Sequence, residues 1–555
     1  MTDFGYHLTN QVNAVSFPLE YDSINPLIYF SNFVGGIWLS VLNTPNVLWA
    51  KVGGVLLTSL NSVIVYSILS TYFDRKKVFV VVLISTLFIT MYFSLIYIHY
   101  FTLPALLINI DLWMLNKTLN TPKNTREHSI YSFLLGFMLI PIILSRITLV
   151  LILVIPLFII LCYCLQNSIH KLSQVNIQLI IAGFVASLII FLLFYWKLGI
   201  LQFSLLHVYN TLGGSVVNDA SQVGKAHTMS SLLSTYRYDV NQMIKGTLLF
   251  IAFVYILSLL KDKIDGRLFN MSVISGTFLG IILLIVSEYS IDQIAFGFLR
   301  TSAGIILLLS IPHIIHYKIN DYRINILLIA GIFVMAVTPI GSDNGLLKAQ
   351  FGLWLILPLS ILLTYRLQNQ TDNKRLRSMS SLLGVLLVSL LILSVFFQFT
   401  NVYRDDQNRF NLNTEFSDTA LLGVYSTNER VEVVDELIVE IRKYSDKGDN
   451  VLIVNDIPML YYLTETKPAL GNSWVFMMSI EKIKVKQSRL ERQGDLPKLF
   501  VYSKINTENR NWPLGNINDS DAGLEKLEYF KERYVSELGY SLLWQNEFFA
   551  IYGKK

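Results

Sequence analysis

The chain has 555 residues, of which 53% are hydrophobic and only 15% are charged, with a formal net charge of +5. Soluble globular proteins carry about 25% charged residues, so this composition excludes a soluble cytoplasmic enzyme and a nucleic-acid-binding protein. Charge is concentrated at the end of the chain: residues 401–555 hold 20 of the 44 Lys and Arg and 24 of the 39 Asp and Glu. The sequence therefore predicts a polytopic α-helical membrane protein that ends in a soluble α/β domain.

The first 48 residues are expected to form an outer-face segment with one interfacial helix. Residues 27–43 are apolar enough to span a bilayer, but two glycines interrupt them and Pro26 and Pro45 bracket them. If they spanned, every later loop would change sides. We therefore predict a re-entrant or interfacial helix here.

Residues 49–400 are expected to form the multi-span membrane domain. A helix needs about 20 apolar residues to cross the hydrocarbon core. Twelve segments are long and apolar enough. They are 49–72, 78–99, 102–118, 129–145, 147–166, 177–198, 245–260, 268–288, 292–315, 323–340, 346–366 and 379–400.

The basic residues predict which loops face the cytoplasm. Sixteen Lys and Arg fall in alternate loops, which the positive-inside rule assigns to the cytoplasmic side. Those loops are Asp74 to Lys77, Lys117 to Arg126, the loop with Lys171, Lys261 to Arg267, Lys318 to Arg323, and Arg366 to Arg377. The N-terminus, the long loop at 199–244 and the C-terminal domain should then lie outside. Because nothing precedes an outward N-terminus to carry it across, we hypothesise a further helix upstream of Met1.

Residues 401–555 read as a small α/β domain. A capping box at Ser426 and Glu429 predicts a helix to about Lys443. Further elements follow from hydrophobic periodicity. These are a strand at 451–454, a helix at 478–492, a strand at 499–502, a helix at 521–537 and a hairpin at 540–552. No Gly-rich loop follows Val454, which argues against a nucleotide site. Acceptor docking or structural support is the expected role.

Cysteine chemistry is not expected to hold this protein together. Cys162 and Cys164 are its two cysteines, and two residues apart on a helix they point to different faces. Neither a disulfide framework nor a zinc site is therefore expected.

Three stretches near the start of the chain carry a family resemblance: Thr2 to His7, Asn25 to Tyr29, and Ala50 to Tyr66. Their succession resembles the membrane-embedded GT-C glycosyltransferases, among them protein mannosyltransferases and aminoarabinose transferases, and it covers about residues 1–400. The resemblance implies a hexosyl or pentosyl transferase in the bacterial inner (plasma) membrane. Its donor would be a polyprenyl-phosphate sugar, and its acceptor a surface glycan, lipid or protein on the outer face.

The same resemblance implies that Asp3 is the catalytic base, since an acceptor hydroxyl must lose a proton to a carboxylate within reach. The alternative is a solvated acid near the chain end. His7 could position substrate or lie at the interface. The next outer loop departs from the family pattern, because no carboxylate appears before Asp111. His99 in this loop could serve in its place in binding substrate, or it could be a structural histidine at the interface. A second acidic site, and with it a divalent metal such as Mg or Mn, is left open.

Two arginines within the membrane region are candidates for contact with a lipid-linked phosphate. Charged side chains at this depth are costly and usually have a partner or a function. Arg146 lies at the outer end of a tight helix pair, and Arg300 about eight residues into its span. The competing interpretations are snorkelling of Arg146 to headgroups and an ion pair of Arg300 with Asp111 or Glu288.

A polar, Gly-rich turn on the outer face is a further candidate. Asp343 and Asn344 could hold sugar hydroxyls, and Lys348 could reach a phosphate. A turn without chemistry explains the same residues equally well. The loop at 199–244 is long enough to act as a lid or to be a plain surface loop.

Two other functions compete with the transferase. An O-antigen-type polymerase or ligase has about as many spans but carries its large loop between late helices. A polysaccharide flippase or transporter should show internal repeats. We find no such repeat, and a folded outer domain suits transport poorly.

Overall fold

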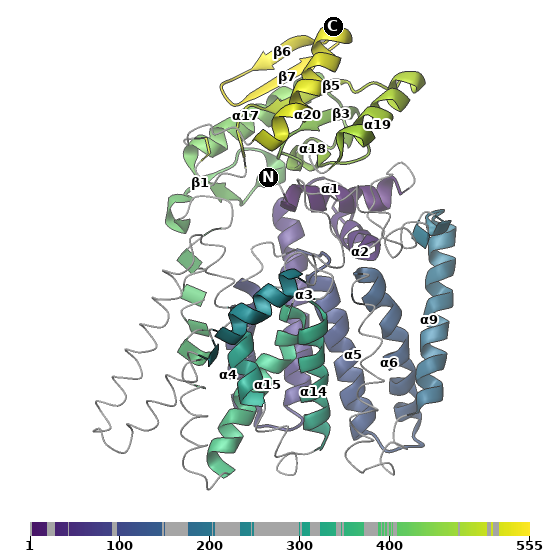
Figure 1. The fold of residues 1–555 in the computed structure, drawn as a ribbon, viewed down its shortest axis with the longest axis vertical. Helices are drawn as coiled ribbons and strands as arrows, with labels where there is room; N and C mark the ends of the chain where they lie inside the picture. Colours follow the sequence, from purple (N-terminus) through teal and green to yellow (C-terminus); the bar gives the residue numbers. More distant parts are fainter. Residues whose placement is uncertain are drawn as a thin grey trace, which may run out of the picture.

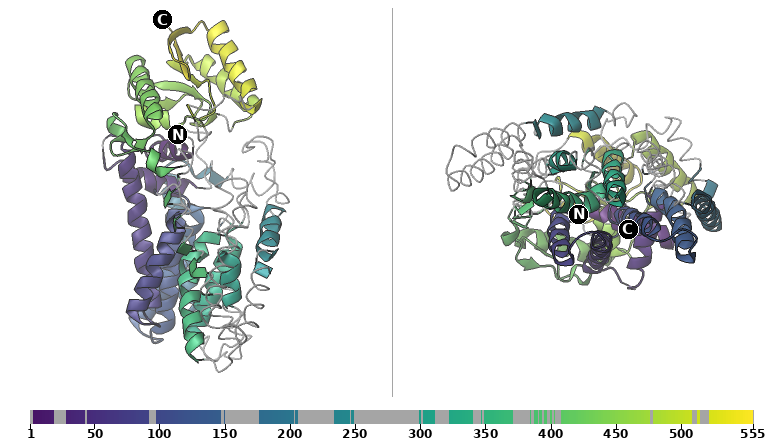
Figure 2. Two further views of the ribbon diagram at one scale, coloured as in Figure 1. Left: turned by 90° about the vertical axis from the view of Figure 1, so that its left-hand side faces the viewer. Right: turned by 90° about the horizontal axis from the view of Figure 1, so that it is seen from below.

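A bundle of long helices carries a smaller α/β domain at one end, and the N-terminus lies at the junction between the two (Figures 1 and 2). In this computed structural model the described residues are 3–18, 28–42, 44–91, 97–146, 149, 176–202, 204–205, 234–245, 247–248, 299, 302–310, 322–339, 346, 349–370, 408–475, 478–507, 512–513 and 521–554, with isolated positions between 384 and 402.

Seven of the predicted spans coincide with helices of the bundle. They are α3 (Val47–Leu69), α4 (Arg75–Met91), α5 (Thr102–Asn120), α6 (Arg126–Ser145), α9 (Ile177–Lys197), α14 (Tyr322–Val337) and α15 (Gln350–Gln370). Among the described residues, α3, α6 and α9 are long and apolar enough to cross a membrane. The predicted span at 268–288 lies outside the described residues, as do all of 147–166 except Leu149 and nearly all of 245–260. Those at 292–315 and 379–400 are described only in part.

Two predictions for this region need correction. The helix predicted at 78–99 does not extend to residue 99: α4 is described as far as Met91, and residues 97–100 form a non-helical bend. The loop predicted at 199–244 is helical at its end, where residues 234–245 form a helix. Buried polar side chains explain the first difference: Tyr97 and His99 are engaged in the contacts described below rather than continuing a lipid-facing helix.

Glycines allow α6 and α9 to pack with their backbones in contact. A Cβ on Gly136 would lie 1.8 Å from the carbonyl oxygen of Ile180, and one on Gly183 would lie 1.9 Å from that of Phe133. Small residues at such crossings let membrane helices approach closely enough for van der Waals packing. The rest of α9 is mostly exposed at the edge of the bundle.

The basic helix ends gather at the end of the bundle that is remote from the α/β domain. Lys77 donates a hydrogen bond from Nζ to the Tyr365 hydroxyl at 3.0 Å, and the Arg323 guanidinium donates to Asn120 Oδ1. These contacts join the start of α4 to the end of α15, and the start of α14 to the end of α5. The loops predicted to share one side of the membrane therefore do share one end of the bundle wherever they are described.

The α/β domain contains a five-stranded sheet in the order β4-β3-β5-β7-β6. Its strands are β3 (Asn450–Val454), β4 (Lys467–Pro468), β5 (Leu499–Ser503), β6 (Ser541–Gln545) and β7 (Phe549–Gly553). β3 pairs in parallel with β4 and β5, whereas β7 is antiparallel to β5 and β6. A separate two-stranded ribbon joins β1 (Thr414–Glu415) to β2 (Tyr425–Ser426).

Alternating side chains bury both faces of this sheet. One face packs against α17 (Asn428–Tyr444) and α18 (Met459–Thr464), and the other packs against α19 (Ile480–Gln493) and α20 (Asp521–Lys531), which continues as a π-helix over Glu532–Glu537. Val451 and Ile453 point to the first face, and Leu452 and Val454 to the second. The predicted strands and long helices of the domain are confirmed, but α18 and β4 were not predicted.

The capping box was placed one residue too early. α17 begins at Asn428 and its N-cap is Thr427, so Ser426 lies in strand β2 instead. The extended backbone of β2 pairs with β1 through Ser426, and this pairing takes precedence over the local capping signal.

Two short helices, α1 (Asp3–Ser16) and α2 (Tyr29–Leu39), lie where the bundle meets the α/β domain (Figure 1). The helix predicted at 27–43 is found as α2. The helix α1 was not predicted. Leu8 of α1 shares one buried core with Val47 of α3 and Leu460 of α18, so α1 joins the two parts of the molecule.

Candidate functional site

The helix α1 is polar yet almost entirely buried, which marks it as more than a linker. Its buried polar side chains are His7, Thr9, Asn10, Gln11 and Asn13, each at most 7% exposed. Thr9 Oγ1 donates to the carbonyl of Pro458 at 3.3 Å, and Gln11 Nε2 donates to the carbonyl of Ile98. Hydrogen bonds to both the α/β domain and the bundle thus hold α1 in place.

Glycine positions fix how closely α1 approaches its neighbours. A Cβ on Gly5 would lie 2.3 Å from Cα of Met459 on α18, and one on Gly36 of α2 would lie 2.1 Å from the carbonyl oxygen of Gln11. Real Cβ atoms do not approach this closely, so α1 is fixed between backbone on one side and backbone on the other. The position of His7 follows from this placement.

The bend between α4 and α5 brings a second imidazole to α1. His99 is 1% exposed, and its Nδ1 lies 3.2 Å from Oγ1 of Thr102 at the start of α5. The same hydroxyl donates to the carbonyl of Tyr97 at 2.7 Å. These bonds close a tight turn that orients the His99 ring. The His7 and His99 ring centroids are 6.2 Å apart.

Arg146 supplies a buried cation at the same place. It is the C-cap of α6, with an extended backbone, and is 7% exposed. Its guanidinium carbon lies 5.5 Å from the ring centroids of both Tyr100 and Phe101 and 5.9 Å from that of Phe351 on α15. Cation–π contacts in a desolvated setting are worth about 2 kcal/mol, so three rings hold this charge at the end of the bundle.

Tyr100 connects the cation to the imidazoles. Its ring centroid is 5.0 Å from that of His7 and 5.5 Å from that of His99, and the Arg146 guanidinium carbon lies 5.5 Å from the same centroid. Three predicted residues from separate parts of the sequence, His7, His99 and Arg146, are therefore brought together. We call this set, with Tyr100 and Phe101, the His–Arg cluster.

Sequence reasoning missed the aromatic members of the cluster. Tyr97, Tyr100 and Phe101 flank His99 in one short stretch, and that density of rings beside a histidine was the available signal. Phe351 had no signal, since its approach to Arg146 depends on how α15 packs.

The structure describes few of the remaining predicted site residues. Asp3 begins α1, one helical turn before His7, but only its backbone is described. Arg300, Asp343, Asn344 and Lys348 lie outside the described residues. Close to the last three, the amide of Leu346 donates to Oδ2 of Asp239 at 2.9 Å. Asp239 belongs to the predicted 199–244 loop, so the two predicted outer loops meet there.

The described residues contain no group of three or more His, Cys, Asp or Glu that could hold a metal ion. The His–Arg cluster itself offers two imidazoles, and an ion needs further ligands. What the described cluster can do chemically is bind an anion through Arg146 and donate or accept protons through two histidines.

We compared the chain with known proteins, and it is similar to solved structures. No family model and no curated protein matches the chain. The chain is similar to ArnT from Cupriavidus metallidurans in the apo state, with 8% identity and a TM-score of 0.43. It is also similar to the same protein bound to undecaprenyl phosphate, with 9% identity and a TM-score of 0.45. Each comparison covers 100% of this chain and 93% of the other. ArnT is an aminoarabinose transferase of the GT-C family.

Proposed function

We propose that this protein is a membrane glycosyltransferase that moves a hexose or pentose from a polyprenyl-phosphate donor to a surface glycan, lipid or protein acceptor. The observation that carries the proposal is Arg146, a cation buried among aromatic rings beside two imidazoles at the end of a membrane helix bundle. A buried guanidinium is suited to a phosphate because it presents several donors in a plane and attracts charge strongly where water is excluded.

The reaction divides between two groups. The acceptor hydroxyl oxygen attacks the anomeric carbon of the donor, and the bond from that carbon to the phosphate oxygen breaks with its electron pair staying on the phosphate. Arg146 stabilises the negative charge that develops there. The proton of the acceptor hydroxyl goes to a carboxylate, for which Asp3 is our candidate. Asp3 lies on α1, whose docking also positions His7.

The outer face of the bacterial plasma membrane is the proposed place of reaction. The basic helix ends lie together at the end of the bundle remote from the α/β domain, joined by contacts such as Lys77 with Tyr365. The positive-inside rule assigns that end to the cytoplasm. The His–Arg cluster and the α/β domain, at the opposite end, would then face outward, where lipid-linked sugars are consumed.

The proposal is tested by sugar transfer from a polyprenyl-phosphate donor in membranes. Wild-type protein should release sugar, Asp3→Asn should lose turnover with normal expression, and Arg146→Gln should raise the KM for donor and lower kcat. Arg323→Gln, which removes an arginine at the opposite end of the bundle, is the matched control and should retain turnover. No release by the wild type would reject the function; unchanged kinetics of Arg146→Gln would reject the phosphate site alone.

The same assay tests whether transfer depends on a divalent metal, Mg or Mn. Membranes treated with EDTA and then resupplied with each ion give the comparison. Restoration of lost turnover would identify a metal-dependent enzyme, and His7→Gln and His99→Gln would then show whether the imidazoles contribute to its binding.

A further inference from the structure

An exposed leucine occupies the corner of a tight turn where the α/β domain meets the bundle. The turn covers 421–424 and is closed by a hydrogen bond from the amide of Val424 to the carbonyl of Leu421 at 2.9 Å. Leu422, with φ −52° and ψ 130°, and Gly423, with φ 77°, give it type II geometry. Proline and polar residues usually occupy turns that face water, yet the side chain of Leu422 is apolar and 59% exposed.

Three backbone donors of this segment find their partners within it. The amide of Gly423 donates to the carboxylate of Glu415 at 2.8 Å. The amide of Ala420 donates to Oδ1 of Asp418 at 2.9 Å, and that of Leu421 donates to the carbonyl of Asp418 at 2.9 Å. Backbone groups beside hydrocarbon must be satisfied by the protein, because lipid chains offer no partners. The turn is therefore suited to the boundary of an apolar phase.

The turn lies against the first turn of α3. A Cβ on Gly423 would lie 3.2 Å from Cδ2 of Leu48. Leu48 is itself exposed and begins a stripe of exposed apolar side chains along α3. The others are Val52, Val55, Leu56, Leu60 and Val63. Because these residues follow one another at intervals of three and four, they share one side of a helix that is long and apolar enough to cross a membrane. This flank of α3 faces acyl chains.

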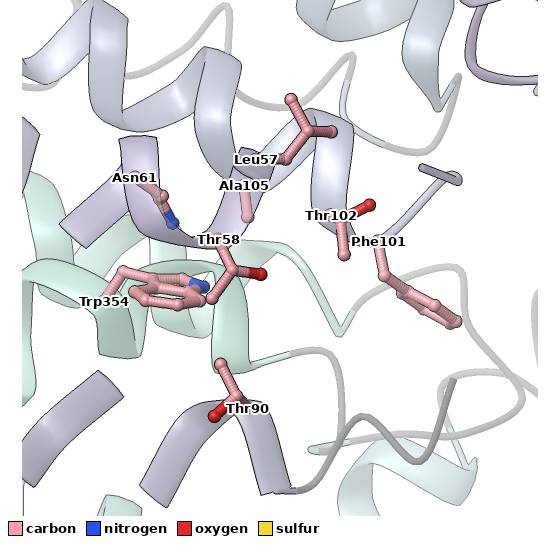
Figure 3. A pocket seen from close by; sticks show the side chains of 8 residues that line it. All are labelled: Leu57, Thr58, Asn61, Thr90, Phe101, Thr102, Ala105 and Trp354. Carbon is pink, nitrogen blue, oxygen red and sulfur yellow. The ribbon is translucent and has the colours of Figure 1, made fainter. Parts of the chain in front are cut away.

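The opposite flank of α3 packs on protein. Thr58 and Asn61 lie with Thr102 of α5 and Trp354 of α15 around a small pocket (Figure 3). Asn61 is buried, as is Trp354. The exposed stripe is therefore a separate, lipid-facing side of the helix, and the turn that carries Leu422 continues this side beyond the end of α3.

The length of α3 places this contact at the boundary of the bilayer. At about 1.5 Å per residue, its 23 residues extend about 33 Å, and the helix ends shortly before the basic turn at Asp74 to Lys77. The hydrocarbon core is about 30 Å thick, so Leu48 lies near its opposite edge. Trp49 is the next residue and stacks on Trp38 of α2 with ring centroids 4.4 Å apart. Tryptophan is enriched at membrane interfaces, which agrees with this depth.

A second exposed apolar side chain of the domain has a similar setting. Phe410 is 67% exposed, and its ring centroid lies 6.5 Å from that of Phe399, near the end of the span predicted at 379–400. The neighbouring Arg409 donates from Nε to the carbonyl of Phe399 at 2.8 Å, which fixes this approach. The α/β domain thus presents one exposed apolar residue beside each of two bundle segments.

We propose that Leu422 and Phe410 insert between the headgroups and acyl chains of the adjacent leaflet, so that the α/β domain binds the lipid surface directly. The partner is the bilayer that surrounds the bundle. It is recognised by its apolar boundary and not by a particular headgroup, as for other interfacial apolar segments. The contact fixes the height of the α/β domain above the bilayer, and it does not depend on the transferase reaction.

Carbene labelling of the full-length wild type in phosphatidylcholine liposomes tests this contact. A lipid-soluble aryl diazirine, activated by light, should label the peptides that carry Leu422 and Phe410 as it labels α3. Val485 of α19 is the matched control, because it is 68% exposed and lies on the sheet face opposite to the core that includes Val47 of α3. Its peptide should stay unlabelled. Leu422→Asn should lose the labelling over 419–425, and equal labelling of the Leu422 and Val485 peptides would overturn the proposal.

Spin labels distinguish the bilayer from a second copy of the chain. In a background with Cys162→Ser and Cys164→Ser, a nitroxide on Leu422→Cys should collide with oxygen and be shielded from a water-soluble nickel chelate. The label on Val63→Cys of the α3 stripe should behave in the same way, and that on Val485→Cys should show the reverse. Shielding from both reagents with spin–spin broadening would mean that a second copy covers Leu422. That result, or access to the chelate equal to that of Val485→Cys, would overturn the proposal.

Discussion

The hydroxyl of Tyr462 on α18 accepts a hydrogen bond from the backbone amide of Asn46 at 2.9 Å and donates one to the carbonyl of the same residue at 3.2 Å. Asn46 is also the N-cap of α3, where its Oδ1 accepts from the amide of Trp49 at 2.7 Å. A single phenol group therefore fastens the α/β domain to the residue from which a bundle helix begins. Burial raises the pKa of Tyr462 to about 12, so the hydroxyl keeps its proton at neutral pH.

Tyr462→Phe should loosen this attachment without disturbing the sheet. Both hydrogen bonds are lost and the Asn46 amide is left without its partner, which costs about 1–3 kcal/mol. Amide hydrogen exchange over 44–50 and α18 should become about tenfold faster or more. Tyr444→Phe removes a hydroxyl that bonds to Leu543 within the domain, so it is the matched control. Equal exchange at 44–50 in all three proteins would contradict the attachment.

Gly5→Val should abolish the docking of α1. The added side chain would meet the Met459 backbone, where even a Cβ would lie 2.3 Å from Cα, so α1 must move away from α18. Because His7 is on the same short helix, sugar transfer should fall by at least tenfold although Gly5 has no chemical group to contribute. Gly384→Ala, whose Cβ would have its nearest neighbour at 3.6 Å, should retain transfer. Full turnover in Gly5→Val would mean that the placement of α1 does not matter.

Gly183→Val should separate α9 from α6. Overpacking of a tight contact typically costs about 1–3 kcal/mol, and here a Cβ would lie 1.9 Å from a carbonyl oxygen. The thermal midpoint of the protein in detergent should fall. Ser187→Ala lies one turn further along the same helix and removes a buried hydroxyl that has no hydrogen-bond partner among the described residues. That variant should be neutral or slightly stabilising, and a drop equal to that of Gly183→Val would contradict close packing at the glycine.

The ion pair that joins Glu491 of α19 to Arg533 of the π-helix over 532–537 should weaken in acid. The hydrogen bond from Arg533 lowers the pKa of the Glu491 carboxyl, outweighing the opposite effect of burial. Stability from a lowered carboxyl pKa is complete above its unfolded value of about 4.3 and is lost as pH falls through the lower folded value. Since Arg533 is 33% exposed, the contribution is about 1 kcal/mol or less.

Glu491→Gln tests this ion pair. The variant should expose α19 and the 532–537 helix to faster amide exchange at pH 7, and the remaining exchange should no longer accelerate between pH 5 and pH 3 beyond the intrinsic rate. The wild type should accelerate over the same range. Identical pH profiles for the two proteins would show that the pair contributes nothing to folding.

Local sequence patterns predicted most helices and strands, but they could not predict contacts between elements that are distant in the sequence. Length and apolar composition were enough for helices such as α3 and α9, and alternation was enough for β3 and β5. Helix α1 was not predicted because its own residues are polar. It packs between α2 and α18, and the sequence does not show that these elements are its neighbours. The number of spans predicted that His99 and Arg146 lie at the same end of the bundle. It could not predict that each lies 5.5 Å from the ring centroid of the same residue, Tyr100.

The hydrogen bond from Thr9 to Pro458 joins residues 449 positions apart, and this has a consequence in time. At a synthesis rate of about 5–20 residues per second, roughly 20 to 90 s separate the emergence of α1 from that of its partner. During this interval the polar side chains of α1 can contact the bundle but not α18. A chain stalled before α18 would therefore lack the contacts that hold α1 on the side of the α/β domain.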